Sequence, residues 1–134
     1  MNSNKTGGYK LINPKDIKEE QIWGPKARFY EKKLYRDDKI AINLRRQPAQ
    51  ESVQSEGGYQ LHTHDDSTEI VVVLKGKATG YAESGGLIKI HGGSKAGEIG
   101  SMVIIPPNTR HGSVSGEEEF VALAIFIPPP KVRY

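Results

Sequence analysis

The chain has 134 residues, no cysteine and a formal net charge of +3 at neutral pH. This length predicts one domain, and the lack of cysteine excludes disulfides, thiolate metal sites and a cysteine nucleophile. The longest apolar run, residues 120–127, is far shorter than the roughly 20 residues that span a bilayer. Residues 1–10 also lack the apolar stretch of a secretory signal. We therefore expect a cytoplasmic protein without a membrane partner.

The basic residues are concentrated in the first third of the chain. Residues 1–46 hold 12 Lys and Arg against 6 Asp and Glu, whereas residues 47–134 hold 7 against 10. Acidic residues interrupt the basic ones, as in Lys18-Glu19-Glu20 and Glu31-Lys32-Lys33. Such a mixture is typical of a solvated surface, so we expect no nucleic-acid partner. A basic interaction module in residues 1–46 is the alternative, and its binding to nucleic acid would depend strongly on salt.

Glycine and proline interrupt the chain at short intervals, and the segments between them alternate or are rich in β-formers. This pattern predicts an all-β sandwich or barrel. Residues 13–20 are the one stretch that suggests a helix, of at most two turns. Lys75-Gly76 predicts a tight hairpin. The expected strands are 27–35, 39–46, 59–64, 69–74, 77–83, 87–91, 101–105 and 119–127.

Two of these strands predict further contacts. Residues 70–74 and 120–127 are apolar at every position, so neither face of these strands suits water. The outer face is therefore predicted to meet a second sheet or a partner subunit, which favours a homodimer. We expect residues 27–134 to form the barrel domain and residues 1–26 to be an N-terminal extension that packs on the barrel or on the partner.

Three of the four histidines and one glutamate follow turns and strands in a way that brings them together. His62 and His64 are two residues apart at the end of an expected strand, so they share a face. The turn 65–68 leads to Glu69, and the turn 106–109 leads to His111. A lone histidine is more often a surface or core residue, but three imidazoles and a carboxylate suit Fe, Mn, Ni, Co or Zn. We therefore expect one divalent metal ion at this cluster.

The same residues resemble the two motifs of the cupin family. The matching patterns are His62-x-His64-x4-Glu69-x6-Gly76 for the first motif and Gly100-x5-Pro106-x-Asn108-x2-His111 for the second. Asn108 stands where the family usually has glycine, and both residue types adopt the left-handed turn conformation. The resemblance implies an antiparallel double-stranded β-helix, a jelly-roll-like barrel, in which the three histidines and Glu69 bind the metal.

The resemblance also implies a class of function without selecting one reaction. Cupins include dioxygenases, isomerases, lyases and non-catalytic binding proteins, and the ligand set does not separate them. We expect a metal-dependent enzyme that acts on a small, oxygen-rich molecule chelated by the metal, and rank dioxygenase chemistry slightly above isomerase or lyase chemistry. The alternative is a non-catalytic cupin that binds a small metabolite or sugar.

Three further residues, Gln60, Arg45 and Tyr81, are candidates for catalysis. Arg45 and Arg46 are neighbours on one expected strand, so one faces inward, where a guanidinium can anchor a carboxylate or phosphate; a surface pair is the alternative. Gln60 shares the face of the first two ligands. Tyr81 is a candidate proton donor, although tyrosines at strand spacing more often pack. His91, in a glycine-rich loop, is expected to be a surface residue.

Overall fold

The computed structural model describes residues 8–22, 28–49, 61–82, 86–95 and 98–131. In these ranges the regular structure is β-strand apart from one short 3-10 helix. The elements are η1 (Pro14–Asp16), β1 (Glu20–Ile22), β2 (Phe29–Arg36), β3 (Ala41–Gln47), β4 (Thr68–Lys75), β5 (Lys77–Ala82), β6 (Gly86–His91), β7 (Met102–Ile105), β8 (His111–Ser115) and β9 (Phe120–Ile127). The described part of the chain contains no helix of the length and hydrophobicity that a membrane crossing requires.

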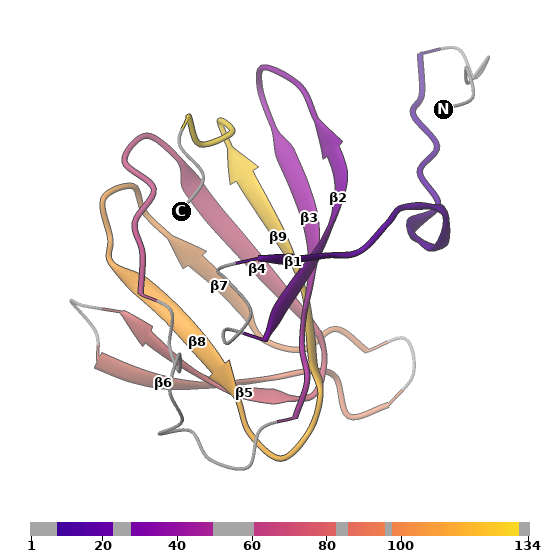
Figure 1. Cartoon of the computed structure of the whole chain (residues 1–134). Helices are drawn as coiled ribbons and strands as arrows, with labels where there is room; N and C mark the ends of the chain where they lie inside the picture. Colours follow the sequence, from indigo (N-terminus) through magenta and orange to yellow (C-terminus); the bar gives the residue numbers. More distant parts are fainter. Residues whose placement is uncertain (1–7, 23–27, 50–60, 83–85, 96–97, 132–134) are drawn as a thin grey trace.

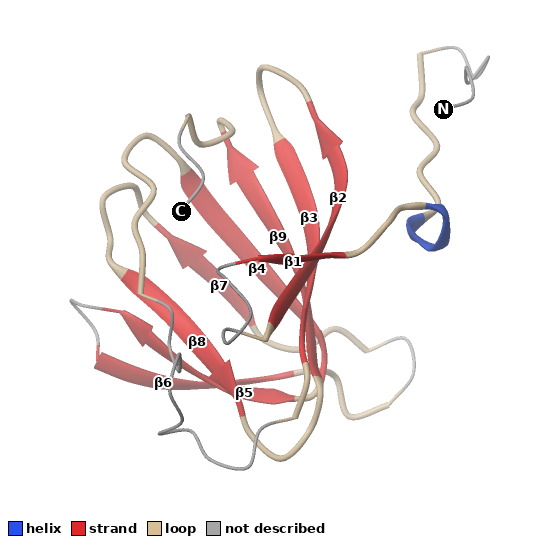
Figure 2. Cartoon of the chain, in the orientation of Figure 1, coloured by secondary structure: helices blue, strands red, loops and turns tan. Residues whose placement is uncertain are grey.

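The strands form two antiparallel sheets that face each other (Figures 1 and 2). The larger sheet has the order β1-β2-β3-β9-β4-β7, and the smaller one has the order β6-β5-β8. Strands distant in the sequence are neighbours here, because β9 lies between β3 and β4. The arrangement confirms the predicted all-β class.

The core lies between the two sheets. Strand β9 shows the reason, because Phe120, Ala122, Ala124 and Phe126 are buried while the residues between them are partly exposed. Successive side chains of a strand point to opposite faces, so each strand contributes every second residue to the interior. The strands of the smaller sheet add Ala78 and Ile90 to this core.

The chain turns sharply between β4 and β5, but the hairpin predicted at Lys75-Gly76 is wrong, because β4 belongs to the larger sheet and β5 to the smaller one, and the two strands pair with other partners. Gly76 has a φ of 82°, which favours glycine, and a Cβ built there would lie 1.9 Å from the carbonyl oxygen of Glu119. Asn108, in the turn before β8, likewise has a positive φ of 61°. The asparagine thus takes the backbone conformation expected of the glycine that it replaces.

Three segments differ from the sequence expectations. The helix expected at residues 13–20 is the single turn η1, and the chain then pairs as β1 with β2. A helix of two turns has little stability of its own, whereas the edge of β2 offers backbone partners. Strand β8 was not expected, because its sequence His-Gly-Ser-Val-Ser lacks an apolar alternation. Of the strand expected at 59–64, residues 59–60 lie outside the described residues, and 61–64 contain only a bridge from His62 to His111.

An ion-pair cluster fastens the N-terminal segment to the larger sheet. Arg46 Nη2 and Nε donate to the Glu19 carboxylate at 2.7 and 2.9 Å, and Arg46 Nη1 lies 3.2 Å from Glu119. The hydrogen bond from Arg46 lowers the pKa of Glu19 below its usual value. Each of these side chains is about one-third exposed, so solvent screens the pair and its stabilisation is modest.

We expect Glu19→Gln to lower the free energy of unfolding by about 0.5–1 kcal/mol at pH 7. Because the pKa of Glu19 is lowered in the folded state, this stabilisation is present above the usual glutamate pKa and is lost as the pH falls through the folded value. Urea unfolding at pH 7 and pH 3 should therefore show a difference from wild type that shrinks at the lower pH.

The matched control is Glu20→Gln. Glu20 contacts Lys33 at 3.4 Å with both side chains about half exposed. Its replacement should therefore lower the free energy of unfolding by less than Glu19→Gln does. An equal loss in the two variants, or a Glu19→Gln effect that is the same at both pH values, would contradict the assignment.

Candidate metal centre

The polypeptide backbone brings the predicted ligands together. His62 N–H donates to His111 O and His111 N–H donates to His62 O, both at 2.9 Å. Asn108 N–H donates to His64 O at 3.0 Å. These three bonds fasten the segment before β4 to the start of β8 and to the turn that precedes it. Glu69 then enters from β4.

The four side chains form a compact cluster. One potential ligand atom from each of His62, His64, Glu69 and His111 can be chosen so that all lie within 4.8 Å of one another. Glu69 Oε1 is 2.9 Å from His111 Nε2 and 3.4 Å from His64 Nε2. His62 is partly exposed and the other three residues are buried. Sites of three imidazole nitrogens and one carboxylate oxygen suit divalent transition metals, so the cluster is able to hold such an ion.

The His111 ring has its orientation fixed by a neighbour. Its Nδ1 donates to the carbonyl oxygen of Thr109 at 2.7 Å, which leaves Nε2 as the nitrogen that faces Glu69. Metal-binding histidines in proteins commonly make this kind of bond from the ring nitrogen that does not bind the ion. The geometry therefore directs Nε2, the ring nitrogen that would bind an ion, to the centre of the cluster.

A buried arginine adds positive charge beside the cluster. Arg45 Nη1 is 3.7 Å from Glu69 Oε2, and Arg45 Nε is 3.5 Å from Glu31 Oε1. Burial alone would raise the pKa of Glu69, but hydrogen bonds with His111 and His64 and the charge of Arg45 outweigh it and lower the pKa. Burial lowers the pKa of Arg45, and the charge of Glu69 opposes that shift. Glu69 is thus kept as a carboxylate.

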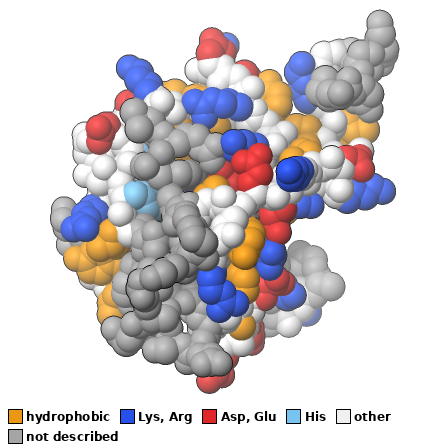
Figure 3. Space-filling model, in the orientation of Figure 1, with side chains coloured by type: hydrophobic (Ala, Val, Ile, Leu, Met, Phe, Trp, Pro, Cys, Tyr) orange, Lys and Arg blue, Asp and Glu red, His pale blue; other side chains and the backbone are white. Residues whose placement is uncertain are grey.

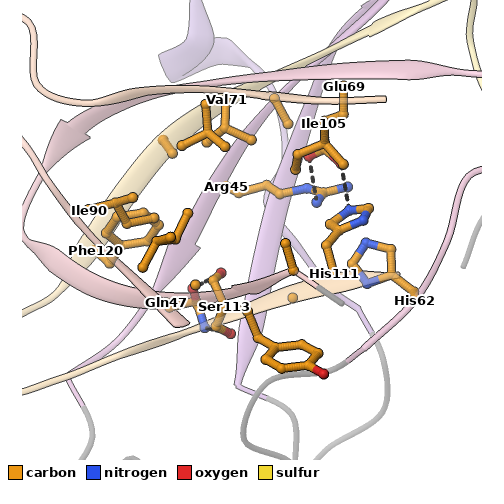
Figure 4. Close-up of a pocket in the computed structure, with 18 of the residues that line it drawn as sticks. Arg45, Gln47, His62, Glu69, Val71, Ile90, Ile105, His111, Ser113 and Phe120 are labelled. Carbon is orange, nitrogen blue, oxygen red and sulfur yellow. Dashed lines mark hydrogen bonds and ion pairs between the residues drawn. The ribbon is translucent and has the colours of Figure 1, made fainter. Parts of the chain in front are cut away.

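A cavity of about 90 Å³ lies beside the cluster and between the sheets (Figure 4). A single buried water needs only about 10–15 Å³, so the cavity can take a small organic group. Its polar lining includes Arg45, Gln47, Tyr81 and Ser113 together with three residues of the cluster. The rest of the wall is mainly apolar and comes from both sheets: Phe29, Val71, Ala82, Ile88, Ile90, Val103, Ile105, Phe120, Ala122 and Ala124.

The structure places most of the predicted catalytic residues. Arg45 and Tyr81 both line the cavity, whereas Arg46 points outward and stacks on the Tyr30 ring at 4.6 Å. The alternation predicted for the two arginines is therefore confirmed. Gln60 lies outside the described residues, so its role stays a prediction. His91 is exposed, as expected, and its ring contacts the carbonyl oxygen of Gly92.

Three residues near the site were missed by sequence reasoning. Glu31 was interpreted as part of a solvated charged surface, but its side chain is fully buried beside Arg45. Gln47 and Ser113 line the cavity. The sequence spacing could have identified the last two, because Gln47 is two residues from Arg45 and Ser113 is two residues from His111. The period of two places each on the inward face of its strand.

Comparison with known proteins shows a likeness in structure. No family model matches the chain, and no curated protein matches it. KdgF from Halomonas sp. superposes with a TM-score of 0.69 at 14% identity, covering 90% of this chain and 95% of that one. The polyketide cyclase RemF from Streptomyces resistomycificus superposes with a TM-score of 0.67 at 16% identity, covering 92% of this chain and 82% of RemF. An RmlC-like cupin from Shewanella frigidimarina superposes with a TM-score of 0.65 at 14% identity, covering 87% of this chain and 88% of that protein.

These likenesses extend over most of each chain, so they concern the whole fold rather than a shared motif. At identities of 14–16% they show the fold alone. The chain has the double-stranded β-helix fold of the cupins, which confirms the predicted architecture.

We expect His64→Ala to lose its bound metal. The substitution removes one nitrogen of the cluster, and should weaken binding by at least the roughly 10–100-fold that loss of an outer-shell partner costs. Elemental analysis of the variant, purified without added metal, measures the loss. His91→Ala is the control, because His91 lies outside the cluster. A His64→Ala protein with the metal content of wild type would contradict the assignment.

Proposed function

We propose that the protein is a metal-dependent enzyme that acts on a small molecule, with His62, His64, Glu69 and His111 holding one divalent ion. The observation that carries the proposal is the convergence of these four side chains beside a cavity. Cavities of this kind, with a few convergent polar groups in an apolar wall, are the usual form of a substrate site. The proposed ion is Fe, Mn, Ni, Co or Zn, which the donor set suits.

When bound, such an ion would supply Lewis acidity and a binding point for two oxygen atoms of the substrate. The chain's own residues prepare that site. Arg45 lies between the Glu31 and Glu69 carboxylates, and its proposed role is to hold Glu69 in place and to offset negative charge. Tyr81 lines the same cavity and is the proposed proton donor. Gln60 is proposed as a further polar group near the first two ligands.

The cavity lining favours an enzyme over a non-catalytic binding protein. A simple binding pocket needs only apolar and hydrogen-bonding groups near the ion, whereas this cavity also contains the ionisable side chains of Arg45 and Tyr81. Ionisable groups held beside a reactive centre are the usual means of moving protons or balancing charge during a reaction. The alternative, a cupin that binds a metabolite or sugar without reaction, is therefore ranked second.

The same lining supports dioxygenase chemistry over isomerase or lyase chemistry. Proton transfer at carbon needs a general base. Among the described lining residues the imidazoles and the carboxylate all belong to the metal cluster, and the proposed role of Tyr81 is that of a proton donor. An apolar wall, in contrast, suits the small apolar dioxygen molecule. We therefore propose that the substrate is oxidised by dioxygen, with isomerisation or elimination as the second reaction class.

Elemental analysis followed by oxygen uptake tests this function. Protein purified without added metal should contain about one transition-metal ion per chain, and iron with oxygen uptake on a panel of small vicinal diols, catechols and 2-oxo acids is the expected result. Zinc or manganese without uptake would overturn the dioxygenase proposal in favour of isomerisation, elimination or binding. A chain without stoichiometric metal would overturn the metal-dependent function itself.

We also propose that the protein is a homodimer formed through the outer face of the larger sheet. Two rows of apolar residues run across β3, β9, β4 and β7 in register. The rows are Ile42, Ile125, Ile70 and Ile104, and Leu44, Leu123, Val72 and Met102. Met102 and Ile104 are 62% and 64% exposed. A contiguous apolar face of this kind on a small domain is typical of a protein interface.

Light scattering coupled to size exclusion tests the interface. The wild-type protein should have the mass of a dimer, and Ile104→Glu should have that of a monomer, because a charge on this face opposes its burial. Leu87→Glu is the control, since Leu87 is 62% exposed but lies on β6 in the other sheet. A monomeric wild type, or a dimeric Ile104→Glu protein, would contradict the proposal.

Figure 3 shows Lys and Arg side chains interspersed with Asp and Glu over the face that it presents. This mixture supports the expectation of a small-molecule rather than a nucleic-acid partner. The cytoplasmic location stays a prediction from the sequence.

A further inference from the structure

The cavity lining contains a second polar pair, separate from the metal cluster. Gln47 lies on β3, two residues beyond Arg45, and Ser113 lies on β8, two residues beyond His111. The two strands belong to different sheets, and the side chains meet between them (Figure 4). Gln47 Nε2 donates to Ser113 O at 3.2 Å, and Ser113 Oγ donates to Gln47 Oε1 at 3.2 Å.

This pair keeps unused hydrogen-bonding capacity. A carboxamide has two N–H donors and two acceptor positions, and a hydroxyl oxygen has two acceptor positions besides its donor. The two bonds between Gln47 and Ser113 use one carboxamide N–H, one carboxamide acceptor position and the hydroxyl proton. Both residues line the cavity, and Gln47 is only 2% exposed. The pair therefore offers a neutral donor and a neutral acceptor in a largely apolar surrounding.

The strand geometry sets the distance from this pair to the metal cluster. Two residues along a strand correspond to roughly 7 Å. Arg45 and Gln47 are therefore about this far apart along β3, and His111 and Ser113 along β8. This spacing is about the length of a single ring with one substituent. Side chains such as Val71, Ile90 and Phe120 line the cavity beside them, so the part of a ligand that lies between the two polar positions contacts apolar walls.

We propose that Gln47 and Ser113 are the specificity determinants of this site and bind a neutral hydroxyl or carbonyl group of the substrate. This inference rests on the proposed function and names the substrate class. The substrate has a compact apolar carbon frame, a pair of chelating oxygens at one end and a neutral hydroxyl or carbonyl about 7 Å away at the other.

The charges of the site exclude an anionic group beside Gln47 and Ser113. Arg45 is the one basic side chain among the described residues that line the cavity, apart from the histidines. It contacts both Glu31 and Glu69, so its charge is balanced within the protein. A carboxylate or phosphate near Gln47 would be buried without a matching cation, which is costly. A neutral oxygen needs no cation and can be satisfied by hydrogen bonds with Gln47 and Ser113.

The test compares two catechols that differ by one hydroxyl group. Both 4-(hydroxymethyl)catechol and 4-methylcatechol carry the chelating oxygen pair, and only the first has an oxygen at the far end of the ring. With zinc-loaded full-length protein, we expect calorimetry to show about 3- to 10-fold tighter binding of the first compound, the range that corresponds to one net hydrogen bond.

Two variants test whether Gln47 and Ser113 cause the preference for 4-(hydroxymethyl)catechol. Ser113→Ala and Gln47→Leu should bring the two dissociation constants to within about twofold of each other, while 4-methylcatechol still binds. Ser115→Ala is the matched control, because the Ser115 hydroxyl lies on the same strand and bonds Pro48 O at 2.6 Å but does not line the cavity. This control should keep the wild-type preference.

The outcomes separate this inference from the proposed function. If wild type binds both catechols equally, or if Ser113→Ala and Gln47→Leu keep the preference, the role of the pair is overturned while metal-dependent binding stands. If the wild-type chain takes up no stoichiometric zinc at the cluster, the metal-dependent function fails, and the substrate class proposed here fails with it.

Discussion

The structure of the site depends on one buried carboxylate. Glu69 is 3% exposed and lies among two imidazoles and a guanidinium. A buried charge is tolerated only when it is paired and hydrogen-bonded, so the surroundings of Glu69 are tightly constrained. His111, His64 and Arg45 meet that need from three different segments, and Glu31 then balances the arginine. A divalent cation bound at the centre would satisfy the same carboxylate more directly.

The shape of the cavity follows from the alternation of side chains along the strands. Each strand directs every second residue inward, so a polar residue two positions from a site residue also reaches the cavity. On β3 and β8 this produces a polar wall that begins at Arg45 and His111. On β6 and β9, and on β4 beyond Glu69, the same alternation produces apolar walls. A substrate that fits this interior must itself be polar at defined points and apolar between them.

Much of this arrangement could be predicted from the sequence. Turn residues and alternation located most strands, and the spacing of His62, His64, Glu69 and His111 indicated that they converge. Strand β8 was missed because its inward residues are polar, which an analysis of apolar periodicity does not detect. Glu31 was misread because its lysine neighbours resemble a solvated surface, whereas its burial depends on Arg45 from the adjacent strand. Such cross-strand pairing is a property of the tertiary fold, and local sequence does not contain it.

The central claim is that one divalent ion binds where the four side chains meet. Anomalous diffraction, recorded at the absorption edge of the metal in crystals of the protein as purified, locates that ion directly. The account predicts one peak per chain, with His62, His64, Glu69 and His111 as its protein ligands. A peak at any other place in the chain, or an ordered cluster with no peak in a protein that has been supplied with metal, would contradict it.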